Sequence, residues 1–202
     1  MELLMNYSLC KKNFYAILVG FTLLLSGCAT TGAGGVATDS SKRTAVKVTQ
    51  TAKGALITSD ERILFDTGRA DVKADGKIFV ARVAKILKER TKADIVIEGH
   101  TDNIGGEKAN LQLSASRADA VRTELIRAGI DGKRIAFKGF GPSQPSASNS
   151  TPEGRQANRR TEILVVGETV EKIGGASLGD RLSDGLENFL KDPLGTFKKV
   201  FE

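Results

Sequence analysis

The sequence predicts an α/β sandwich in which helices pack on one face of a mixed sheet. Short apolar segments, typical of strands, alternate along the chain with segments whose apolar residues recur at helical spacing. From residue 54 onward the order is strand, helix, strand, helix, strand, short helix, strand. The length of 202 residues is enough for one domain of ordinary size with short appendages.

Residues 1–27 have the three parts of an export signal. Lys11 and Lys12 precede an apolar run over residues 14–25, and the small residues Ser26 and Gly27 follow it. The run is shorter than the roughly 20 residues that a membrane-spanning helix needs. This pattern favours a cleaved signal peptide over an uncleaved anchor.

Cys28 stands at the expected cleavage point. The stretch Leu25-Ser26-Gly27-Cys28 resembles the lipobox of bacterial lipoproteins, whose cysteine is lipidated and becomes the mature amino terminus. The alternative is a chance cysteine after an ordinary signal peptide. Ala29 occupies the position where Asp would keep such a lipoprotein in the inner membrane. The resemblance therefore implies a lipid anchor in the outer membrane, with the folded domain facing the periplasm.

Residues 28–53 predict a flexible tether, because they contain few large apolar side chains to offset the entropy of ordering. The folded domain is then expected over residues 54–167. Ala55-Leu56-Ile57 and Ile63-Leu64-Phe65 are expected to be strands, the second ending in a turn at residues 66–68. An amphipathic helix is expected from Asp75, a plausible cap, with the apolar positions Phe79, Val80, Val83, Ile86 and Leu87.

The second half of the domain continues this alternation. A buried strand at residues 95–97 precedes a helix that ends at Gly129. The apolar stripe of this helix is expected to comprise Leu111, Ala118, Val121, Leu125 and Ala128. A strand at 134–140, a loop to residue 150, a short helix begun by Thr151-Pro152-Glu153 and a strand at 161–166 complete the predicted domain.

Asp102 and Arg117 are expected to converge at one strand end. The buried strand delivers Asp102 to a Gly-rich turn, and the following helix carries Arg117, which lies off the centre of the apolar stripe, back toward the same place. A carboxylate accepts hydrogen bonds from an ammonium, and a guanidinium binds a carboxylate through two parallel N–H groups. The pair therefore suits a zwitterion, such as the free amino-acid end of a ligand.

Several short motifs follow one another in order between residues 63 and 166. They are Phe65-Asp66, Gly99-His100-Thr101-Asp102, Asn110, Leu113-Ser114 with Arg117-Ala118, Gly139-Phe140-Gly141, Thr151-Pro152-Glu153-Gly154-Arg155 and Asn158-Arg159-Arg160. Together they resemble the OmpA-like peptidoglycan-binding domain, and so many ordered matches are more specific than any one of them. The resemblance implies that Asp102 and Arg117 bind the diaminopimelate side chain of peptidoglycan stem peptides. Diaminopimelate ends in an ammonium and a carboxylate on one carbon, which is the zwitterion expected from the charges.

The same resemblance implies that Asp66, Thr101, Asn110 and Arg159 line the pocket. For Asp66 and Asn110 a second role stays open, since both residue types often close turns through local hydrogen bonds to the backbone. Arg160 is expected to form an exposed salt bridge. Ala109 departs from the family pattern, in which an aromatic residue commonly precedes the Asn, and this change loosens the expected pocket wall.

No catalytic centre, metal site or cofactor is expected. His100 is the single histidine, so a zinc site would rest on one imidazole and carboxylates, which is a poor match to the usual ligand sets. Ser114 and Ser116 lack the G-x-S-x-G pattern of a nucleophile elbow. His100 is therefore expected to be structural, packing or hydrogen-bonding under the turn. The net charge of +6 comes from scattered Lys and Arg without a basic tract, which argues against nucleic acid as a partner.

Residues 168–202 are expected to form a C-terminal extension of two short amphipathic helices, one starting with a capping box at 177–180 and one after Asp192-Pro193. Two roles are open: the helices cover a bare patch of their own domain, or they dock an envelope protein partner or the membrane surface. The leading interpretation of the whole chain is a noncatalytic anchor, with lipid at Cys28 and peptidoglycan in the pocket. The alternative is an envelope interaction scaffold that uses the C-terminal helices.

Overall fold

The computed structural model of the chain describes residues 46–175 and 177–191, with side chains as far as residue 184. The expected signal peptide, Cys28, the tether up to residue 45 and the helix expected after Asp192 lie outside the described residues.

The strands form one mixed sheet in the order β1-β2-β5-β3-β4. Only β3 and β4 pair in parallel, and the neighbours β1–β2, β2–β5 and β5–β3 pair antiparallel. The strands are β1 Val46–Thr51, β2 Gly54–Asp60, β3 Ile95–His100, β4 Ile135–Gly141 and β5 Arg160–Val166. The helices are α1 Glu61–Leu64, α2 Ala74–Arg90, α3 Glu107–Arg127, α4 Pro152–Asn158, α5 Val170–Ile173 and α6 Leu178–Lys191, and a 3-10 turn occupies Gly132–Arg134.

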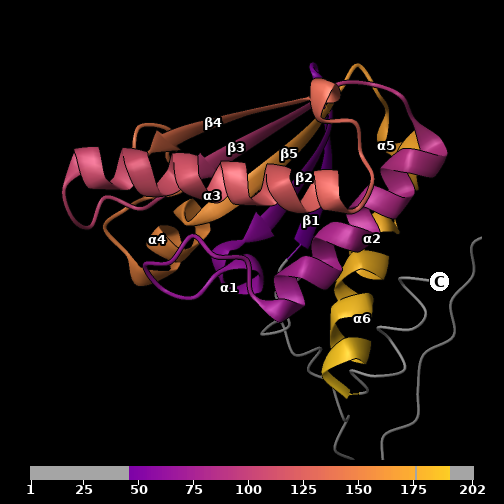
Figure 1. Cartoon of the computed structure of the whole chain (residues 1–202). Coiled ribbons are helices and arrows are strands. Elements are labelled where there is room, and N and C mark those ends of the chain that lie inside the picture. The colour runs from indigo at the N-terminus through magenta and orange to yellow at the C-terminus, as the bar shows by residue number, and fades with distance from the viewer. Residues whose placement is uncertain (1–45, 176, 192–202) are drawn as a thin grey trace, which may run out of the picture. The chain divides into compact units, whose positions relative to one another are not determined.

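The helices α2 and α3 lie on the same face of the sheet (Figure 1). Their apolar stripes, represented by Phe79 and Leu125, are buried against Ile57, Ile97 and Ile163 of the central strands. The predicted α/β sandwich is therefore confirmed, and so is the alternation of strands and helices from residue 54 onward. Within the described part of the chain, no helix has the length and apolar character needed to cross a membrane.

The expected boundary between tether and domain was wrong. Val46–Thr51 forms β1, an antiparallel hairpin partner of β2, and Val46 is 1% exposed in the core. Valines at 46 and 48 alternate with polar residues over this stretch, which is the two-residue period of a half-buried strand. The signal is short and follows a polar region, so it was assigned to the tether.

The expected strand at Ile63-Leu64-Phe65 was also wrong. The chain leaves the sheet at Asp60, whose side chain accepts a hydrogen bond from the backbone N–H of Arg62 and caps the one-turn helix α1. Ile63, Leu64 and Phe65 are all buried. An apolar run of three residues is compatible with either structure, and the capping acid at its start decides for the helix.

The helix α3 departs from its predicted apolar stripe in its first half. Ala118, Val121 and Leu125 of the predicted stripe are fully buried, whereas Leu111 is 48% exposed. Arg117, which was expected off the centre of the stripe, is buried, with 3% of its surface exposed. The N-terminal half of α3 crosses the ends of β3 and β4, and its first turn extends beyond them (Figure 1). The helix therefore presents its buried charge, rather than an apolar residue, toward the end of the sheet.

Glycines allow α3 to lie directly on the strands. A Cβ placed on Gly99 would come within 2.2 Å of the carbonyl oxygen of Ser114, and one on Gly139 within 2.3 Å of the amide nitrogen of Ala115. Only glycine fits such a contact between backbones. The Ser114 hydroxyl also accepts a hydrogen bond from the amide of Gly141 at 2.9 Å, so the start of α3 is fixed against the ends of β3 and β4.

The C-terminal extension belongs to the core of the domain as far as it is described. Val170, Ile173, Leu178 and Leu182 are buried, and α6 passes so close to β1 that a Cβ on Gly179 would lie 3.6 Å from the carbonyl oxygen of Val46. Of the two roles left open for residues 168–202, covering the chain's own domain is the one supported for residues 170–182.

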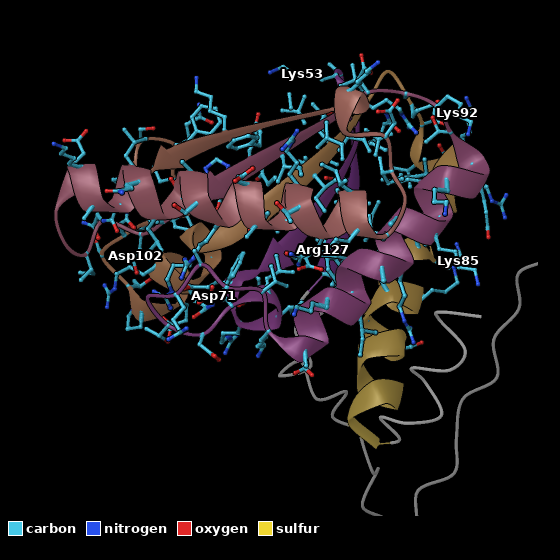
Figure 2. The ribbon with its side chains drawn as sticks, viewed as in Figure 1. Lys53, Asp71, Lys85, Lys92, Asp102 and Arg127 are labelled. Carbon is cyan, nitrogen blue, oxygen red and sulfur yellow. The ribbon has the colours of Figure 1, made fainter. Side chains whose placement is uncertain are left out.

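Charged side chains of both signs cover the outside of the domain. Lys85 and Lys92 lie on and just after α2, Arg127 ends α3, and Lys53 lies in the β1–β2 turn at the opposite end of the sheet from Asp102 (Figure 2). The end of the sheet that carries Asp102 is therefore distinct from the end that carries the hairpin turn.

Replacing Leu182 with Ala tests whether α6 is part of the core. The side chain is 1% exposed, so its truncation should lower the free energy of unfolding by about 2 kcal/mol or more. The matched control is Asp184→Ala, an exposed change in the same helix that should shift stability by less than about 0.5 kcal/mol. Urea denaturation of both variants measures the difference, and equal stabilities would show that α6 is not packed on the domain.

Candidate functional site

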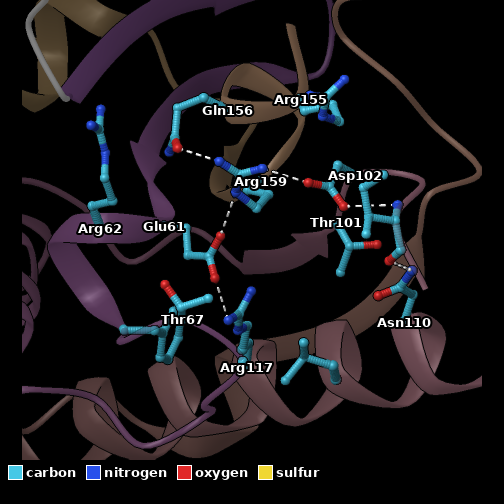
Figure 3. Close-up of a pocket in the computed structure, with 14 residues that line it drawn as sticks. Glu61, Arg62, Thr67, Thr101, Asp102, Asn110, Arg117, Arg155, Gln156 and Arg159 are labelled. Carbon is cyan, nitrogen blue, oxygen red and sulfur yellow. Dashed lines mark hydrogen bonds and ion pairs between the residues drawn. The ribbon is translucent and has the colours of Figure 1, made fainter. Parts of the chain in front are cut away.

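A pocket of about 440 Å³ opens at the end of the sheet where β3 finishes (Figure 3). This volume falls in the range typical of small-ligand sites. Of the residues predicted for the site, Thr101, Asp102, Asn110, Arg117 and Arg159 line it. The other lining residues are Glu61, Arg62, Phe65, Thr67, Gly68, Ile104, Leu113, Arg155 and Gln156.

The charges in the pocket form a chain of alternating sign (Figure 3). Arg117 pairs through Nη2 with Glu61 Oε1, and the other oxygen of Glu61 lies 3.0 Å from Arg159 Nε. Arg159 in turn pairs through Nη1 with Asp102 Oδ2. The expected convergence of Asp102 and Arg117 on one pocket is therefore found, but the two are joined through Glu61 and Arg159 rather than facing each other alone.

The register of the sheet brings Glu61 and Arg159 together. Asp60, the last residue of β2, is opposite Arg160, the first residue of β5. Glu61 follows Asp60 and Arg159 precedes Arg160, so these two residues are neighbours as well. The amide of Glu61 donates a hydrogen bond to the carbonyl of Arg159 at 3.0 Å. Glu61 is 6% exposed, so its carboxylate is held away from water between two guanidinium groups.

Asp102 is fixed by the turn that follows β3. Its Oδ1 accepts a hydrogen bond from the amide of Ile104 at 3.0 Å, and the amide of the preceding Thr101 donates to the carbonyl of Gly141 at 3.0 Å. Thr101 is buried, and its hydroxyl has no hydrogen-bond partner among the described residues. A buried hydroxyl without a partner is costly, which makes Thr101 a candidate contact for a ligand.

Arg117 is oriented by backbone and aromatic contacts as well as by Glu61. Its Nε donates to the carbonyl oxygen of Arg69 at 2.8 Å, and its guanidinium carbon lies 5.1 Å from the ring centroid of Phe65, within the range of a cation–π contact. Nε and Nη2 are thus engaged by the protein. The remaining nitrogen, Nη1, offers donors to a ligand carboxylate.

The two residues for which a turn role was left open differ in the structure. Asn110 lines the pocket, and its amide also donates to the carbonyl of Ile104 at 2.8 Å, so it closes the loop that carries Asp102. Asp66 is exposed and is not among the residues that line the pocket. Its carbonyl accepts from the amide of Arg69 at 3.0 Å, which makes Asp66 a turn residue.

Sequence reasoning missed Glu61, Arg155 and Gln156. Gln156 accepts a hydrogen bond from Arg159 and donates to Asp60 at 2.8 Å, so it supports the central guanidinium from the side of α4. The sequence does contain a signal for Glu61. An acid one residue after a strand lies opposite a base one residue before the antiparallel partner of that strand. Using that signal requires knowing that β2 pairs with β5.

Of the two structural roles expected for His100, packing or hydrogen-bonding, the structure shows packing, and neither ring nitrogen has a hydrogen-bond partner among the described residues. His100 is 1% exposed, and its ring stacks on Phe140 with centroids 5.4 Å apart. Burial, together with the nearby charge of Arg160, lowers the pKa of His100 from its ordinary value to about 4. The side chain lies on the sheet face away from α2 and α3, and so not in the pocket.

Arg160, which was expected to form an exposed salt bridge, pairs with Glu162 on the same face as His100. Its side chain is only 10% exposed, so the salt bridge is largely buried.

Comparisons with known proteins agree with this fold. Residues 64–159 match the model of the OmpA family. The chain is 40% identical over 127 residues to the probable lipoprotein YiaD of Escherichia coli, covering 63% of this chain and 58% of that protein. It is 47% identical over 98 residues to the peptidoglycan-binding protein ArfA of Mycobacterium tuberculosis, covering 48% of this chain and 30% of that protein. The chain thus spans less than two thirds of the length of these curated relatives.

Among solved structures, the cell wall anchor of the T6SS from Pseudomonas aeruginosa is similar with a TM-score of 0.56 and 30% identity. The match covers 60% of this chain and 87% of that one. The names of that anchor and of the mycobacterial relative describe binding and anchoring proteins rather than enzymes, in agreement with the expectation of a noncatalytic protein. The ordered motifs, the sheet topology and these relatives establish that residues 64–159 form a domain of the OmpA family.

Proposed function

We propose that this protein binds the diaminopimelate of peptidoglycan stem peptides and, lipidated at Cys28, anchors the outer membrane to the cell wall without catalysis. The observation that carries the proposal is the pocket with Asp102 at one end of its charge chain and Arg117 at the other. Diaminopimelate is a zwitterion at its free end, and such a pocket offers each of its charges an opposite charge.

The ligand is oriented by this separation of charge. Its ammonium lies beside Asp102, where the Thr101 hydroxyl supplies a further acceptor. Its carboxylate lies beside Arg117 and takes the donors that Glu61 and Arg69 leave unused. Glu61 holds both guanidinium groups in place before the ligand arrives, so that little ordering is needed on binding.

The comparisons support the part of the proposal that concerns peptidoglycan and the cell wall. A relative named for binding peptidoglycan and a structural neighbour named as a cell wall anchor share the matched domain. The membrane end of the proposal is supported by the lipobox resemblance around Cys28 and by the lipoprotein name of the Escherichia coli relative.

Asp102→Asn tests the ammonium end of the site. The amide keeps the acceptor for the Ile104 N–H but loses the charge, so binding to purified sacculi and to a diaminopimelate stem peptide should fall by tens of fold, or about 2 kcal/mol. Folding should change little, because Arg159 keeps Glu61 and Gln156 as partners. Asp71→Asn is the matched control at an exposed acid. Native affinity in the Asp102 variant, measured by calorimetry, would remove Asp102 from the site.

Arg117→Lys tests the carboxylate end. Arg117→Ala is unsuitable, because it would leave the buried carboxylate of Glu61 with one partner fewer and lower stability. Lysine keeps the charge beside Glu61 but cannot offer a two-pronged fork. The native protein should prefer a diaminopimelate stem over a stem ending in lysine, which lacks the second carboxylate, and Arg117→Lys should lose most of that preference.

The control for this experiment is Arg127→Lys, an equivalent change at the exposed end of the same helix, which should keep the preference. Calorimetry with the two stem peptides measures all three proteins. Equal affinity of the native protein for both stems would disprove the proposed ligand while leaving the assignment to the family untouched.

Cys28→Ala tests the membrane end. The variant should not incorporate a labelled fatty acid and should leave the membrane fraction, because the acylated sulfur is missing. Cys10→Ala provides the matched control: it lies in the expected signal peptide and should stay lipidated. Absence of label from the unchanged protein would contradict the anchor proposal without affecting the pocket.

A further inference from the structure

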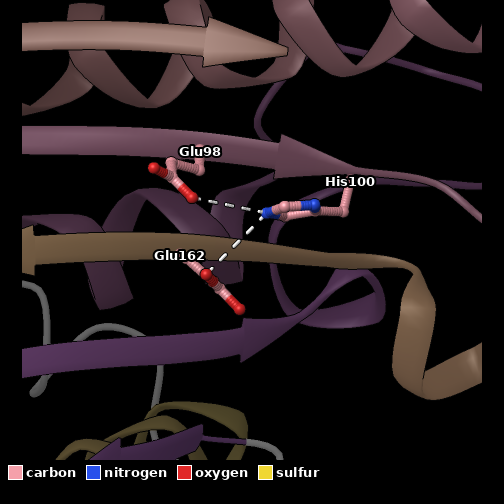
Figure 4. Close-up of side chains that lie close together, drawn as sticks. All are labelled: Glu98, His100 and Glu162. Carbon is pink, nitrogen blue, oxygen red and sulfur yellow. Dashed lines mark ion pairs between the residues drawn. The ribbon is translucent and has the colours of Figure 1, made fainter. Parts of the chain in front are cut away.

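A second cluster of ionisable side chains lies on the sheet face away from α2 and α3 (Figure 4). Glu98 on β3 and Glu162 on β5 are directly opposite each other across an antiparallel pair, and His100 follows two residues after Glu98. The Nε2 atom of His100 lies 3.8 Å from an oxygen of Glu98 and 3.8 Å from an oxygen of Glu162. The three atoms all lie within 4.8 Å of one another.

The facing carboxylates need a cation. Like charges directly opposite on neighbouring strands are destabilising. Arg160 binds one oxygen of Glu162 at 2.7 Å, which leaves the second oxygen, Oε2, turned toward His100. Lys53 and Lys138 also offset the charge of Glu98, but neither forms an ion pair with it among the described residues.

The buried imidazole of His100 is a second, independent observation that points to a ligand. His100 is 1% exposed, and neither Nδ1 nor Nε2 has a hydrogen-bond partner among the described residues. Buried polar atoms are nearly always bonded, and 3.8 Å is too long for a hydrogen bond to either carboxylate. The stacked Phe140 holds the ring with Nε2 directed at both oxygens.

These separations suit ligands that share one small ion. Tetrahedral coordination at bond lengths of about 2.0–2.2 Å puts neighbouring ligand atoms about 3.3–3.6 Å apart. The two distances from Nε2 then need to shorten by a few tenths of an ångström, and the separation of the two carboxylate oxygens, which lie within 4.8 Å of each other, by no more than about 1.5 Å. We propose that Glu98, His100 and Glu162 bind one divalent transition-metal ion of the Zn²⁺ class, with water at the remaining position. One nitrogen and two carboxylate oxygens favour such an ion over Mg²⁺ or Ca²⁺, which prefer oxygen ligands alone.

This proposal departs from the expectation drawn from the sequence and is independent of the diaminopimelate pocket. The sequence was a poor zinc signal, because one imidazole with carboxylates is a poor match to the usual ligand sets, and it did not show that Glu98 and Glu162 face each other. A bound ion would join β3 to β5 beside the ends that carry Asp102 and Arg159, and would stabilise the folded state by mass action.

The test measures Zn²⁺ binding to the full chain freed of metal by chelation. Cys10 and Cys28 are replaced by Ser in every sample so that no thiol competes for the ion. Calorimetry should show one Zn²⁺ per chain, thermal unfolding should shift upward with Zn²⁺, and Mg²⁺ should give no comparable shift. Because second-sphere changes alone commonly cost 10–100-fold in metal affinity, loss of a ligand in Glu98→Gln should weaken Zn²⁺ binding by at least about tenfold.

Matched variants separate the site from adventitious binding. Glu171→Gln, an exposed acid on α5, should bind Zn²⁺ as the native chain does. Glu98→Gln lies at a half-buried position and removes like-charge repulsion, so it should fold even if His100→Gln does not. Absence of saturable Zn²⁺ binding to the native chain, or equal Zn²⁺ affinity in Glu98→Gln and Glu171→Gln, would overturn the proposal.

Discussion

The pocket end of this domain depends on the ion pairs of one buried carboxylate, that of Glu61. It lies between Arg117 of α3 and Arg159, the residue before β5, and so it joins α3 to the paired ends of β2 and β5. Removing one partner of a buried ion pair typically costs about 3–5 kcal/mol, because the other charge is left without compensation. Here Glu61 and Arg159 each pair with two opposite charges, which distributes that cost. The result is a pocket whose shape is set before a ligand binds.

The sheet explains why charges meet at this end. The strands β2 and β3 finish here and β5 begins here, so Glu61, Asp102 and Arg159 follow or precede strand ends that register brings side by side. The close contact of α3 with Gly99 and Gly139 places Arg117 at the same level. The chemistry of the pocket is therefore a consequence of backbone packing rather than of a local sequence motif alone.

Periodicity in the sequence predicted the long elements well. The helices α2 and α3 and the strands β3, β4 and β5 carry strong patterns, and each lies where it was expected to within a few residues. The short elements β1 and α1 were missed because runs of two or three apolar residues do not distinguish strand, helix and tether. Leu111 was misplaced for another reason: helical spacing does not show which members of a stripe the sheet covers, and the Leu111 side chain is 48% exposed although its backbone lies against Gly141.

The sequence predicted most residues of the site but not the ion pairs between them. Motifs placed Thr101, Asp102, Asn110, Arg117 and Arg159 in one pocket, as the structure does. Which acid pairs with which base depends on strand order, and strand order is a long-range property that periodicity does not contain. The same limit hid the juxtaposition of the two glutamates around the single histidine. Asp66 was expected in the pocket from the family resemblance alone; it does not line the pocket, and its backbone carbonyl accepts from the amide of Arg69 in a turn.

The position of β1 has a mechanical consequence if the protein is held by its N-terminal side, as proposed. Val46 is the first residue of the strand and lies at the open end of the β1–β2 hairpin, opposite Ser59 and farthest from the turn. A pulling force transmitted along the chain therefore loads this backbone pair first, and the ladder behind it can open one pair at a time. The helix α6 lies across the same residue. The packing of α6 on β1 therefore adds to the resistance of the first strand to such a force.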